Sequence, residues 1–547
     1  MKLAKYFSIF SQIFADERKR PNVILLLADD FGVGDFQVNQ AKAKVPTPNI
    51  DRLGTEGVNF KDAHSGSSRC SPSRYMLLTG RYSLKDSKER IIKPGREPHL
   101  GLMFKKAGYT TGVFGKTQPF QTMLRNDIQS EDHIRWKKLN EWKKTYANGE
   151  KFNDRFDEKR LFFRPGNYTF MLSEIDHGFD YSFSAESPCC SPNGYFENGK
   201  QVEPFTEWAI QRFFPEGGPT QRELDTGIKF WKGAYVAAPW PKEETYGERF
   251  TNNYPRSMIA QPNFDSRTKD LTISTKLNEF IKANADSEKP FFAYYGMRFG
   301  HGPFNSQEKF RNTTEVGIVG EMIAEADEMV GKLFKALEES NQINNTLIVL
   351  MSDNGAGTNY EPVNEALYGH TQNAIDLTNG DHGVQNVRLK GGKGTNWEGG
   401  HRMPFMWWYP KGFPARTIED KIVSYVDVYR TLSDLVEYKP KCNEGPDSRS
   451  LFPLLTGASD KIDGPEEIMT HAVHFAPQAI RWRKWKLMPK SKEFYKIECD
   501  PAEENNLWDK EWAQQMIQRW GAKLESNIAR IDEREEKTNY GQLEICI

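Results

Sequence analysis

The sequence lacks any excess of charge and any long apolar run. Its 547 residues include 74 Lys and Arg against 75 Asp and Glu, which gives a formal net charge of −1. This balance provides no overall positive field for nucleic acid or an anionic membrane, so we expect no nucleic-acid partner. No stretch reaches the roughly 18 uncharged apolar residues that a spanning helix needs, and no transmembrane segment is predicted. Any anion bound by this protein must therefore be recognised by a local site.

Cysteine is scarce as well. The six cysteines, at positions 70, 189, 190, 442, 499 and 546, show neither metal-ligand spacing nor the density of a disulfide scaffold. The chain also has no internal repeat. Hydrophobic residues make up 37% and aromatic residues 13% of the chain, as in a folded globular protein. A chain of this length favours one large domain with a smaller one.

Residues 1–20 begin with basic side chains, continue with a short apolar stretch over residues 6–14 and reach Ala15 before a charged run. This order resembles a short signal peptide. Ser8 and Ser11 interrupt the apolar stretch, so a frayed amphipathic segment is the alternative interpretation. The signal-peptide interpretation predicts a secreted, lysosomal or periplasmic protein.

Four short apolar segments are typical of buried strands in a parallel sheet, and polar side chains follow each of them. The segments and their following side chains are 23–28 with Asp29 and Asp30, 111–114 with Lys116, 291–295 with His301, and 346–351 with Asp353 and Asn354. Apolar residues at helical spacing over 323–337 precede the last strand, and this alternation predicts an α/β fold. Because ligands bind beyond the carboxyl ends of such strands, the polar side chains should converge.

The side chains after the first and last of these strands offer only oxygen ligands. They are Asp29, Asp30, Asp353 and Asn354. A hard divalent cation prefers such a set, and calcium accepts irregular coordination more readily than magnesium does. One bound Ca2+ is therefore expected. For either pair alone, the alternative is that the side chains cap a helix or a turn.

Residues 70–81 read CSPSRYMLLTGR, in which Cys70 is followed at close spacing by Pro72 and Arg74. This segment resembles the signature of the type I sulfatases, the formylglycine-dependent family. Further landmarks of that family follow in order from Pro21 to about Leu507, including PNVILLLADD, GYTTGVFGK and LKGGKGTNWEGGHRMPF. The last of these is closest in character to the branch of arylsulfatase A-like and N-acetylgalactosamine-6-sulfatase-like enzymes. Pro72 is also placed to open a helix whose N-terminus favours an anion.

The resemblance implies a sulfuric ester hydrolase that acts on a sulfated carbohydrate, such as a polysaccharide, a glycosaminoglycan or a glycolipid. A formylglycine-generating enzyme would be its maturation partner and would oxidise Cys70 to an aldehyde, which hydrates to a diol. One hydroxyl of the diol would attack sulfur while calcium and lysines neutralise the sulfate oxygens. By family position, the catalytic residues would be Cys70, Arg74, Lys116, His301 and Lys393, and the substrate-binding residues Lys116, Gln118, His301 and Lys393.

Position 118 departs from the pattern of many relatives, which carry histidine where this chain has Gln118. Glutamine cannot act as a general base, although it can still form a hydrogen bond with the diol. His64 and His382 are the candidate substitutes for that base. The alternative for each of them is a structural or surface histidine.

The resemblance also implies the fold, which is an α/β, alkaline phosphatase-like sandwich with a large mixed, mostly parallel sheet flanked by helices. Residues 21–440 would form the catalytic domain, and residues 441–547 a small C-terminal α+β subdomain with an antiparallel sheet. Two rival functions stay open: a phosphatase or phosphodiesterase of the same superfamily, and a non-catalytic relative that binds sulfated sugars. The motif at Cys70 opposes the first rival, and the complete set of metal ligands opposes the second.

Overall fold

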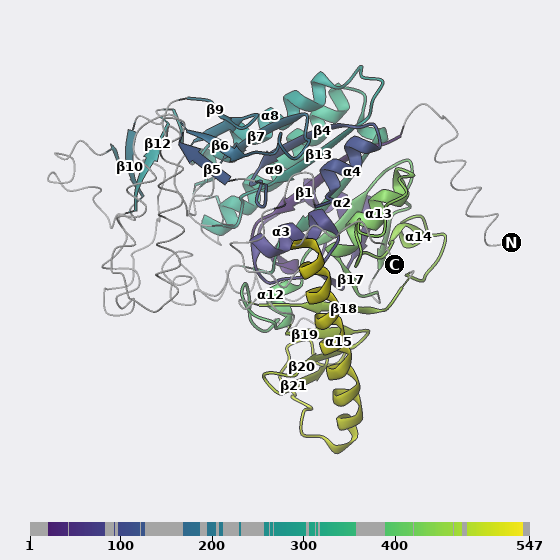
Figure 1. Cartoon of the computed structure of the whole chain (residues 1–547). Helices are drawn as coiled ribbons and strands as arrows, with labels where there is room; N and C mark the ends of the chain where they lie inside the picture. The colour runs from purple at the N-terminus through teal and green to yellow at the C-terminus, as the bar shows by residue number, and fades with distance from the viewer. Residues whose placement is uncertain are drawn as a thin grey trace.

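The structure, a computed structural model, describes residues 20–41, 43–82, 92, 97–120, 122–125, 168–185, 194–203, 207–211, 229–230, 256–261, 263–265, 267–301, 306–311, 313–314, 318–356, 389–418, 421–462, 464–472 and 478–539. Nearly all of the predicted signal peptide, residues 1–19, and also His382 lie outside these ranges. Within them, a large sheet lies between two layers of helices, and a small sheet with one long helix projects from it (Figure 1). None of the helices in these ranges has the length and apolar character that crossing a membrane requires.

The large sheet contains 12 strands in one continuous order. From one edge to the other they are β16 (Arg416–Ile418), β2 (Val58–Phe60), β15 (Phe405–Trp408), β14 (Thr346–Ser352), β1 (Asn22–Ala28), β13 (Phe291–Gly296), β4 (Thr110–Gly115), β7 (Tyr181–Ala185), β8 (Tyr195–Glu197), β9 (Lys200–Gln201), β6 (Tyr168–Leu172) and β5 (Thr122–Arg125). The central strands from β14 to β7 run parallel, and antiparallel pairs extend the sheet on both sides. The predicted α/β sandwich with a large mixed sheet is confirmed.

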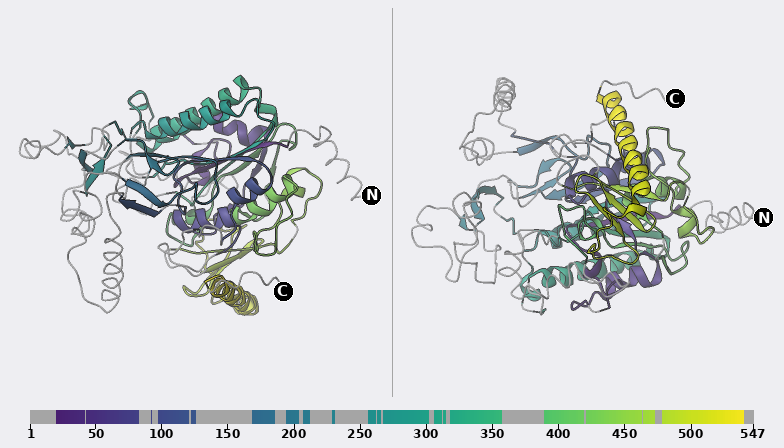
Figure 2. Two further views of the ribbon diagram at one scale, coloured as in Figure 1. Left: turned by 45° about the horizontal axis from the view of Figure 1, so that its top comes forward. Right: turned by 90° about the horizontal axis from the view of Figure 1, so that it is seen from below.

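Helices cover both faces of this sheet, as the left view of Figure 2 shows. One face carries α2 (Pro48–Glu56), α8 (Lys269–Ala283) and α9 (Ile318–Glu339). The opposite face carries α3 (Cys70–Thr79), α4 (Leu100–Lys106) and α13 (Val428–Leu435).

The central strand β1 explains why the predicted strands are apolar along their whole length. Val23, Leu25 and Leu27 belong to the core shared with α3, α4 and α13. Ile24 and Leu26 point the other way, into the core shared with α2, α8 and α9. A strand whose two faces are both covered by helices needs apolar side chains in both directions.

The chain ends in a smaller unit on the α3 side of the sheet (Figure 2). Its antiparallel sheet consists of β18 (Glu467–Thr470), β19 (Ala479–Trp482), β20 (Trp485–Met488) and β21 (Glu493–Lys496), and α15 (Gln514–Asn539) packs on it. Trp482 of β19 stacks on Trp520 of α15, with ring centroids 4.1 Å apart. The predicted antiparallel C-terminal sheet is confirmed, while the domain boundary at residue 440 stays a prediction.

Shorter elements make up the rest of the described ranges, and some of them form a three-stranded and a two-stranded sheet. They are the strands β3 (Ala63–His64), β10 (Glu207–Gln211), β11 (Lys229–Phe230), β12 (Arg256–Ala260) and β17 (Val423–Ser424), the helices α12 (Glu398–His401) and α14 (Phe452–Leu455), and the 3-10 helices η1 (Val33–Asp35), η3 (Glu308–Phe310), η4 (Ile343–Asn345), η5 (Tyr425–Asp427) and η6 (Glu511–Ala513). Two of these, β3 and α12, lie beside the candidate site described below.

All four predicted strands and the predicted helix over 323–337 are present, as β1, β4, β13, β14 and α9. Each observed element extends slightly beyond its predicted range. The helix expected to open at Pro72 begins instead at Cys70, so Pro72 lies within its first turn. Proline is tolerated there because the first N–H groups of a helix have no partner within it.

Candidate active site

Four neighbouring strands bring the predicted side chains to one edge of the sheet. Ala28 of β1 pairs with Ser352 of β14, and Leu27 of β1 pairs with Gly296 of β13. Gly296 in turn pairs with Gly115 of β4. These parallel strands therefore end level with one another, and the site residues come directly after the ends.

Two cations contact the acids that follow β1 and β14. The buried guanidinium of Arg74 places Nε 2.9 Å and Nη2 2.8 Å from Asp353 Oδ2. Its Nη2 atom also lies 3.8 Å from Asp29 Oδ1. Lys116 Nζ, which follows β4, lies 2.8 Å from Asp29 Oδ2. Helix α3 and strand β4 thus supply one cation each to a pair of buried carboxylates.

Asp30 and Asn354 form the other half of the cluster together with Lys393. Lys393 Nζ lies 2.6 and 2.7 Å from the two carboxylate oxygens of Asp30. Asn354 Nδ2 donates to Asp30 Oδ1 over 2.8 Å. Asp30 has φ of 64°, a left-handed conformation that aspartate tolerates better than most side chains. From one strand end, Asp29 and Asp30 therefore contact different lysines.

Cys70 is the first residue of α3 and lies at the edge of this cluster. Its sulfur and one carboxylate oxygen from each of Asp29 and Asp353 lie within 4.8 Å of one another. The side chain is half-buried, and its thiol is not part of a disulfide. The helix N-terminus adds a partial positive charge beside it.

His301 and Gln118 complete the predicted set. One ring nitrogen of His301 lies within 4.8 Å of carboxylate oxygens of both Asp29 and Asp30, and the side chain is half-buried. Gln118 is half-buried as well and follows Lys116 by two residues.

His64 does not reach this cluster as a free base. Its Nε2 atom lies 2.7 Å from Asp62 Oδ1, and its Nδ1 atom lies 2.9 Å from His401 Nδ1. The side chain is fully buried. Because both ring nitrogens are engaged, the interpretation of His64 as a structural histidine is the correct one of the two.

Two glycines at the strand ends allow the chains to approach one another this closely. A Cβ atom on Gly296 would lie 2.2 Å from the Lys116 carbonyl oxygen and 2.8 Å from Arg74 Nη1. Gly115 has φ of 79°, and its Cβ would lie 2.2 Å from the Gly296 carbonyl oxygen. Only glycine fits both positions, so β4 and β13 end in glycine where the Arg74 guanidinium lies against the strand ends.

Burial and the paired charges together decide the protonation of the cluster. Burial alone would raise the pKa of Asp29, but the charge of Lys116 and of the other cations nearby holds it well below its ordinary value. Burial and the negative charge of Asp29 raise the pKa of Asp353 to about 7. Burial and the positive charge of Lys393 lower the pKa of His301 to about 4, so its imidazole is neutral at neutral pH.

The oxygen ligands fit a cation. Asp29 Oδ1 and Asn354 Oδ1 are buried and have no hydrogen-bond partner. Such orphaned acceptors are rare in folded proteins and call for an ion or another ligand. With the carboxylates of Asp30 and Asp353 they make an all-oxygen set, which suits a hard divalent cation. The cluster therefore fits the metal ion expected from the sequence.

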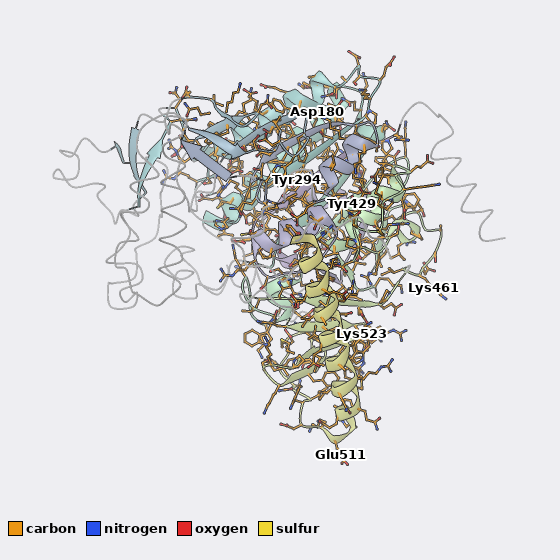
Figure 3. The ribbon with its side chains drawn as sticks, in the orientation of Figure 1. Asp180, Tyr294, Tyr429, Lys461, Glu511 and Lys523 are labelled. Carbon is orange, nitrogen blue, oxygen red and sulfur yellow. The ribbon has the colours of Figure 1, made fainter. Side chains whose placement is uncertain are left out.

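Two residues of the site carry no signal in the sequence motifs. The hydroxyl of Tyr294 in β13 accepts a hydrogen bond from Arg74 Nη1 over 3.2 Å. Figure 3 labels Tyr294 in the interior of the molecule, at the level of the large sheet. Ser352 Oγ, at the end of β14, accepts from the Phe31 amide over 3.0 Å. Strand alternation gives the face of Tyr294, but only the packing of α3 on the sheet brings Arg74 to its hydroxyl.

Comparisons with known proteins agree with this arrangement. The Sulfatase family model matches residues 21–173 and 195–438. N-acetylgalactosamine-6-O-sulfatase of Bacteroides thetaiotaomicron is 26% identical over 524 residues, which cover 89% of this chain and 90% of that protein. Human arylsulfatase H is 26% identical over 512 residues, which cover 87% of this chain and 80% of that protein.

A solved structure with a similar fold comes from work on the metabolism of multiple glycosaminoglycans by Bacteroides thetaiotaomicron. It superposes with a TM-score of 0.65 at 24% identity and covers 93% of this chain and 99% of its own. This likeness supports the sandwich fold over nearly the whole chain.

Proposed function

Because this chain belongs to the sulfatase family, we propose that it removes sulfate from a sulfated carbohydrate by attack of a hydrated formylglycine at position 70 on sulfur. One observation carries the proposal. The thiol of Cys70 lies in the same cluster as an orphaned carboxylate oxygen and two buried cations, at the edge of an all-oxygen metal site. The proposed nucleophile position therefore lies beside the proposed cation ligands and the proposed anion-binding side chains.

The charges of the cluster favour an anionic substrate once a cation is bound. Three carboxylates and three cations balance one another formally, and they are Asp29, Asp30, Asp353, Arg74, Lys116 and Lys393. A bound dication would leave an excess of positive charge, which attracts a sulfate monoester. We propose one Ca2+ held by the three carboxylates and Asn354, because calcium accepts such irregular all-oxygen ligation. When bound, it supplies positive charge to the sulfate oxygens.

The protein's own cations would bind and orient the sulfate group. Lys116 and Lys393 contact Asp29 and Asp30 here, and a cation on those carboxylates would free both ammonium groups to donate to sulfate oxygens. Arg74 would stay on Asp353 and hold the start of α3, and with it position 70. These side chains are buried or nearly so, and the low dielectric constant of such surroundings strengthens their electrostatic interaction with the sulfate group.

His301 would contact the leaving oxygen, and Gln118 the diol or the sugar. A neutral His301 can hold the leaving oxygen through a ring N–H without repelling the lysines. Gln118 can hydrogen-bond the diol or a sugar hydroxyl but cannot take a proton. The hydrated aldehyde made from Cys70 supplies the hydroxyl that attacks sulfur, and a second hydroxyl on the same carbon allows the aldehyde to be regenerated.

A formylglycine-generating enzyme is the proposed maturation partner. Ser73 and Arg74 of the motif are fully buried in α3, so this partner would have to read the motif before the domain has folded. We place the mature enzyme in a secreted, lysosomal or periplasmic compartment, on the strength of the N-terminal segment.

The proposed substrate class is supported by similarity. The bacterial relative that matches 89% of this chain is named as a sulfatase of a 6-O-sulfated amino sugar. We extend to this chain only the broader class, which is sulfated polysaccharides, glycosaminoglycans and glycolipids.

The test is sulfate release from a panel of sulfated saccharides and one aryl sulfate, with calcium, by protein co-expressed with a formylglycine-generating enzyme. Cys70→Ala should lower release by roughly 10³-fold or more, because the nucleophile is gone. Cys499→Ala is the matched control, since Cys499 is an exposed free cysteine, and it should keep full activity. Mass spectrometry of the peptide that contains residue 70 reports whether the aldehyde has formed.

Two outcomes would contradict the proposal. Release of phosphate from matched phosphate esters, without release of sulfate, would favour a phosphatase or phosphodiesterase. Aldehyde at position 70 with no release of either anion would favour a relative that only binds sulfated sugars.

A further inference from the structure

Two loops carry the proposed nucleophile position and one of the proposed sulfate-binding lysines. The nucleophile loop, residues 62–70, leads from β3 into Cys70, and the Lys393 loop, residues 389–402, includes α12. The chemistry proposed above depends on the distance between these two loops. What holds them together is therefore part of how the site works.

The backbones of the two loops are paired directly. His64 forms an antiparallel bridge with Arg402. The Ser65 amide donates to the His401 carbonyl oxygen over 2.8 Å, at one end of the contact. At the other end, the Gly394 amide donates to the Ser68 carbonyl oxygen over 2.8 Å. Gly394, the neighbour of Lys393, is thus hydrogen-bonded to Ser68, which lies two residues before Cys70.

Side-chain contacts join the same two loops as well, among them the Arg402–Asp62 ion pair at 3.1 Å and a pair of histidines. His64 Nδ1 and His401 Nδ1 lie 2.9 Å apart, and both imidazoles are fully buried. Two ring nitrogens at this distance form a hydrogen bond only if one carries a proton and the other does not. The order of protons in this pair is therefore fixed by the groups at its outer ends.

Those outer groups agree on one order. Lys486 Nζ lies 3.1 Å from His401 Nε2, and an ammonium can only donate, so this ring nitrogen accepts. At the other end, the Asp62 carboxylate can only accept, so His64 Nε2 carries a proton and donates to it. It follows that the His401 Nδ1–H donates to His64 Nδ1.

The opposite order is disfavoured. The Asn396 carbonyl oxygen also lies 3.1 Å from His401 Nε2 and by itself would favour a proton there. That N–H would then point toward Lys486 Nζ, which is also 3.1 Å from His401 Nε2, and two donors would face each other.

Burial keeps both rings neutral among charges of both signs. Three carboxylates and three cations surround it, and they are Asp62, Glu398, Glu503, Arg402, Arg481 and Lys486. Burial lowers the pKa of His64 in spite of the Asp62 charge. Burial and the Lys486 charge hold the pKa of His401 well below its ordinary value. A protein at neutral pH therefore carries one proton on each ring.

A metal ion is not a good alternative for this pair. His64, Glu398 and His401 do present ligand atoms within 4.8 Å of one another. However, Lys486 Nζ lies 3.1 Å and Arg481 Nε 3.2 Å from Glu398 Oε1. A cation would have to enter beside two buried positive charges that already neutralise its only carboxylate ligand.

We propose that His64 and His401 are positioning residues whose ordered hydrogen bond holds the Lys393 loop against the nucleophile loop. Lys486 of β20 fixes the order, so the small C-terminal unit takes part in shaping the anion site. The role given to Lys393 rests on the proposed function, whereas the hydrogen bond itself does not. We call this contact the histidine link.

The first test compares two substitutions of His401 by steady-state kinetics. His401→Leu removes the link and should lower kcat roughly 10–100-fold, the range seen when supporting partners of a site are removed. KM should change little, because position rather than binding capacity is lost. His401→Asn keeps an N–H donor at the Nδ1 position and should recover most of kcat.

The control is His99→Leu. His99 is also buried, and its ring nitrogen accepts from the Leu102 amide at the start of α4, outside both loops. Its loss should lower the melting temperature yet leave kcat unchanged. Full kcat in His401→Leu, or an equal loss of kcat in His99→Leu, would overturn the positioning role.

The second test is independent of activity. Ring ¹⁵N NMR of protein labelled at its ten histidines should show His64 with its proton on Nε2 and His401 with its proton on Nδ1, assigned through His401→Asn. A proton on His401 Nε2, or a charged ring at neutral pH, would overturn the ordered link. If no variant or wild-type protein releases sulfate, the proposed function fails while this measurement still decides the link.

Discussion

The candidate active-site cluster and the cluster around the proposed histidine link contain the same numbers of acidic and basic side chains. Each has three carboxylates facing three cations. In the active-site cluster, Asp29 Oδ1 and Asn354 Oδ1 are buried without a hydrogen-bond partner. Around the link, Glu503 Oε1 also lacks a hydrogen bond, but it lies 2.8 Å from Lys486 Nζ, whereas Asp29 Oδ1 lies 3.8 Å from Arg74 Nη2. A buried acceptor without a close partner indicates a place for a ligand, and an ion-paired network indicates architecture.

Access to solvent does not separate the two clusters. The Lys393 side chain is 17% exposed in one, and the Asp62 side chain is 13% exposed in the other. The difference between the clusters lies in the partners of their buried oxygens.

The largest effect on stability is expected from a substitution in the cluster around the histidine link. Arg481→Met removes the charge that contacts Asp62 and Glu398 and leaves buried carboxylates only partly neutralised. Loss of one partner of such a pair typically costs about 3–5 kcal/mol of unfolding free energy, measurable by urea titration. Added calcium should not restore the loss.

The matched control is Arg483→Met, two residues further along. The Arg483 side chain is 74% exposed and pairs with Glu466, so its removal should change the free energy of unfolding by less than about 1 kcal/mol. Equal free energies of unfolding for Arg481→Met and Arg483→Met would contradict a larger stabilising role for the buried network than for a surface ion pair.

A substitution in the candidate active-site cluster should affect activity and the response to calcium together. Asp29→Asn weakens the proposed ion site and should lower kcat/KM roughly 10²–10³-fold, as loss of one electrostatic stabiliser does. The wild-type protein should gain about 2.7 kcal/mol of unfolding free energy at a calcium concentration 100 times Kd, and the variant should gain much less. Thermal unfolding with and without calcium measures this difference.

Asp35→Asn is the control for that experiment. Asp35 is buried near the same strand, and burial raises its pKa well above the ordinary value, so asparagine resembles its neutral form. Its calcium response should be that of the wild-type protein. A calcium response that survives in Asp29→Asn would argue against an ion at this strand edge.

The smallest effect concerns a charge contact that fastens α15 and depends on pH. Asp447 is buried and lies 2.8 Å from a nitrogen of each of Arg530 and Arg534. Burial alone would raise the pKa of Asp447, but the charges of Arg534 and Arg530 lower it. A lowered folded-state pKa means that the stabilisation is complete above the unfolded value of about 3.9 and is lost as pH falls through the folded value.

Arg534→Met should therefore cost about 1.5–3 kcal/mol at neutral pH, as loss of a charged hydrogen bond does. The deficit should shrink as the pH falls below about 3.9, which urea unfolding at several pH values can follow. A deficit that is independent of pH would assign the loss to packing of the arginine stem.

Much of the fold could be predicted because its central strands are covered on both faces. Residues 23–28 and 347–351 are apolar without interruption, as strands buried on both faces require. The acids that follow them could be expected at one edge, since parallel strands end together. The structure contains these strands and that edge.

The partners of the buried polar groups could not be predicted in the same way. The sequence allowed two interpretations of His64, a catalytic base or a structural histidine. Its partner His401 lies 337 positions away, so no local pattern could show their contact. Tyr294 reads as one more apolar position of its strand until Arg74 is placed beside it.

The sequence by itself determined the strands, the order of the landmarks and the identity of the residues at the strand ends, because periodicity and motif spacing are local properties. Only the tertiary structure decided which buried oxygens stay unsatisfied, which cation meets which carboxylate, and how Lys486 orders the histidine link. The physical reason is that burying a polar or charged group is costly unless a partner meets it, and that partner comes from packing between distant segments.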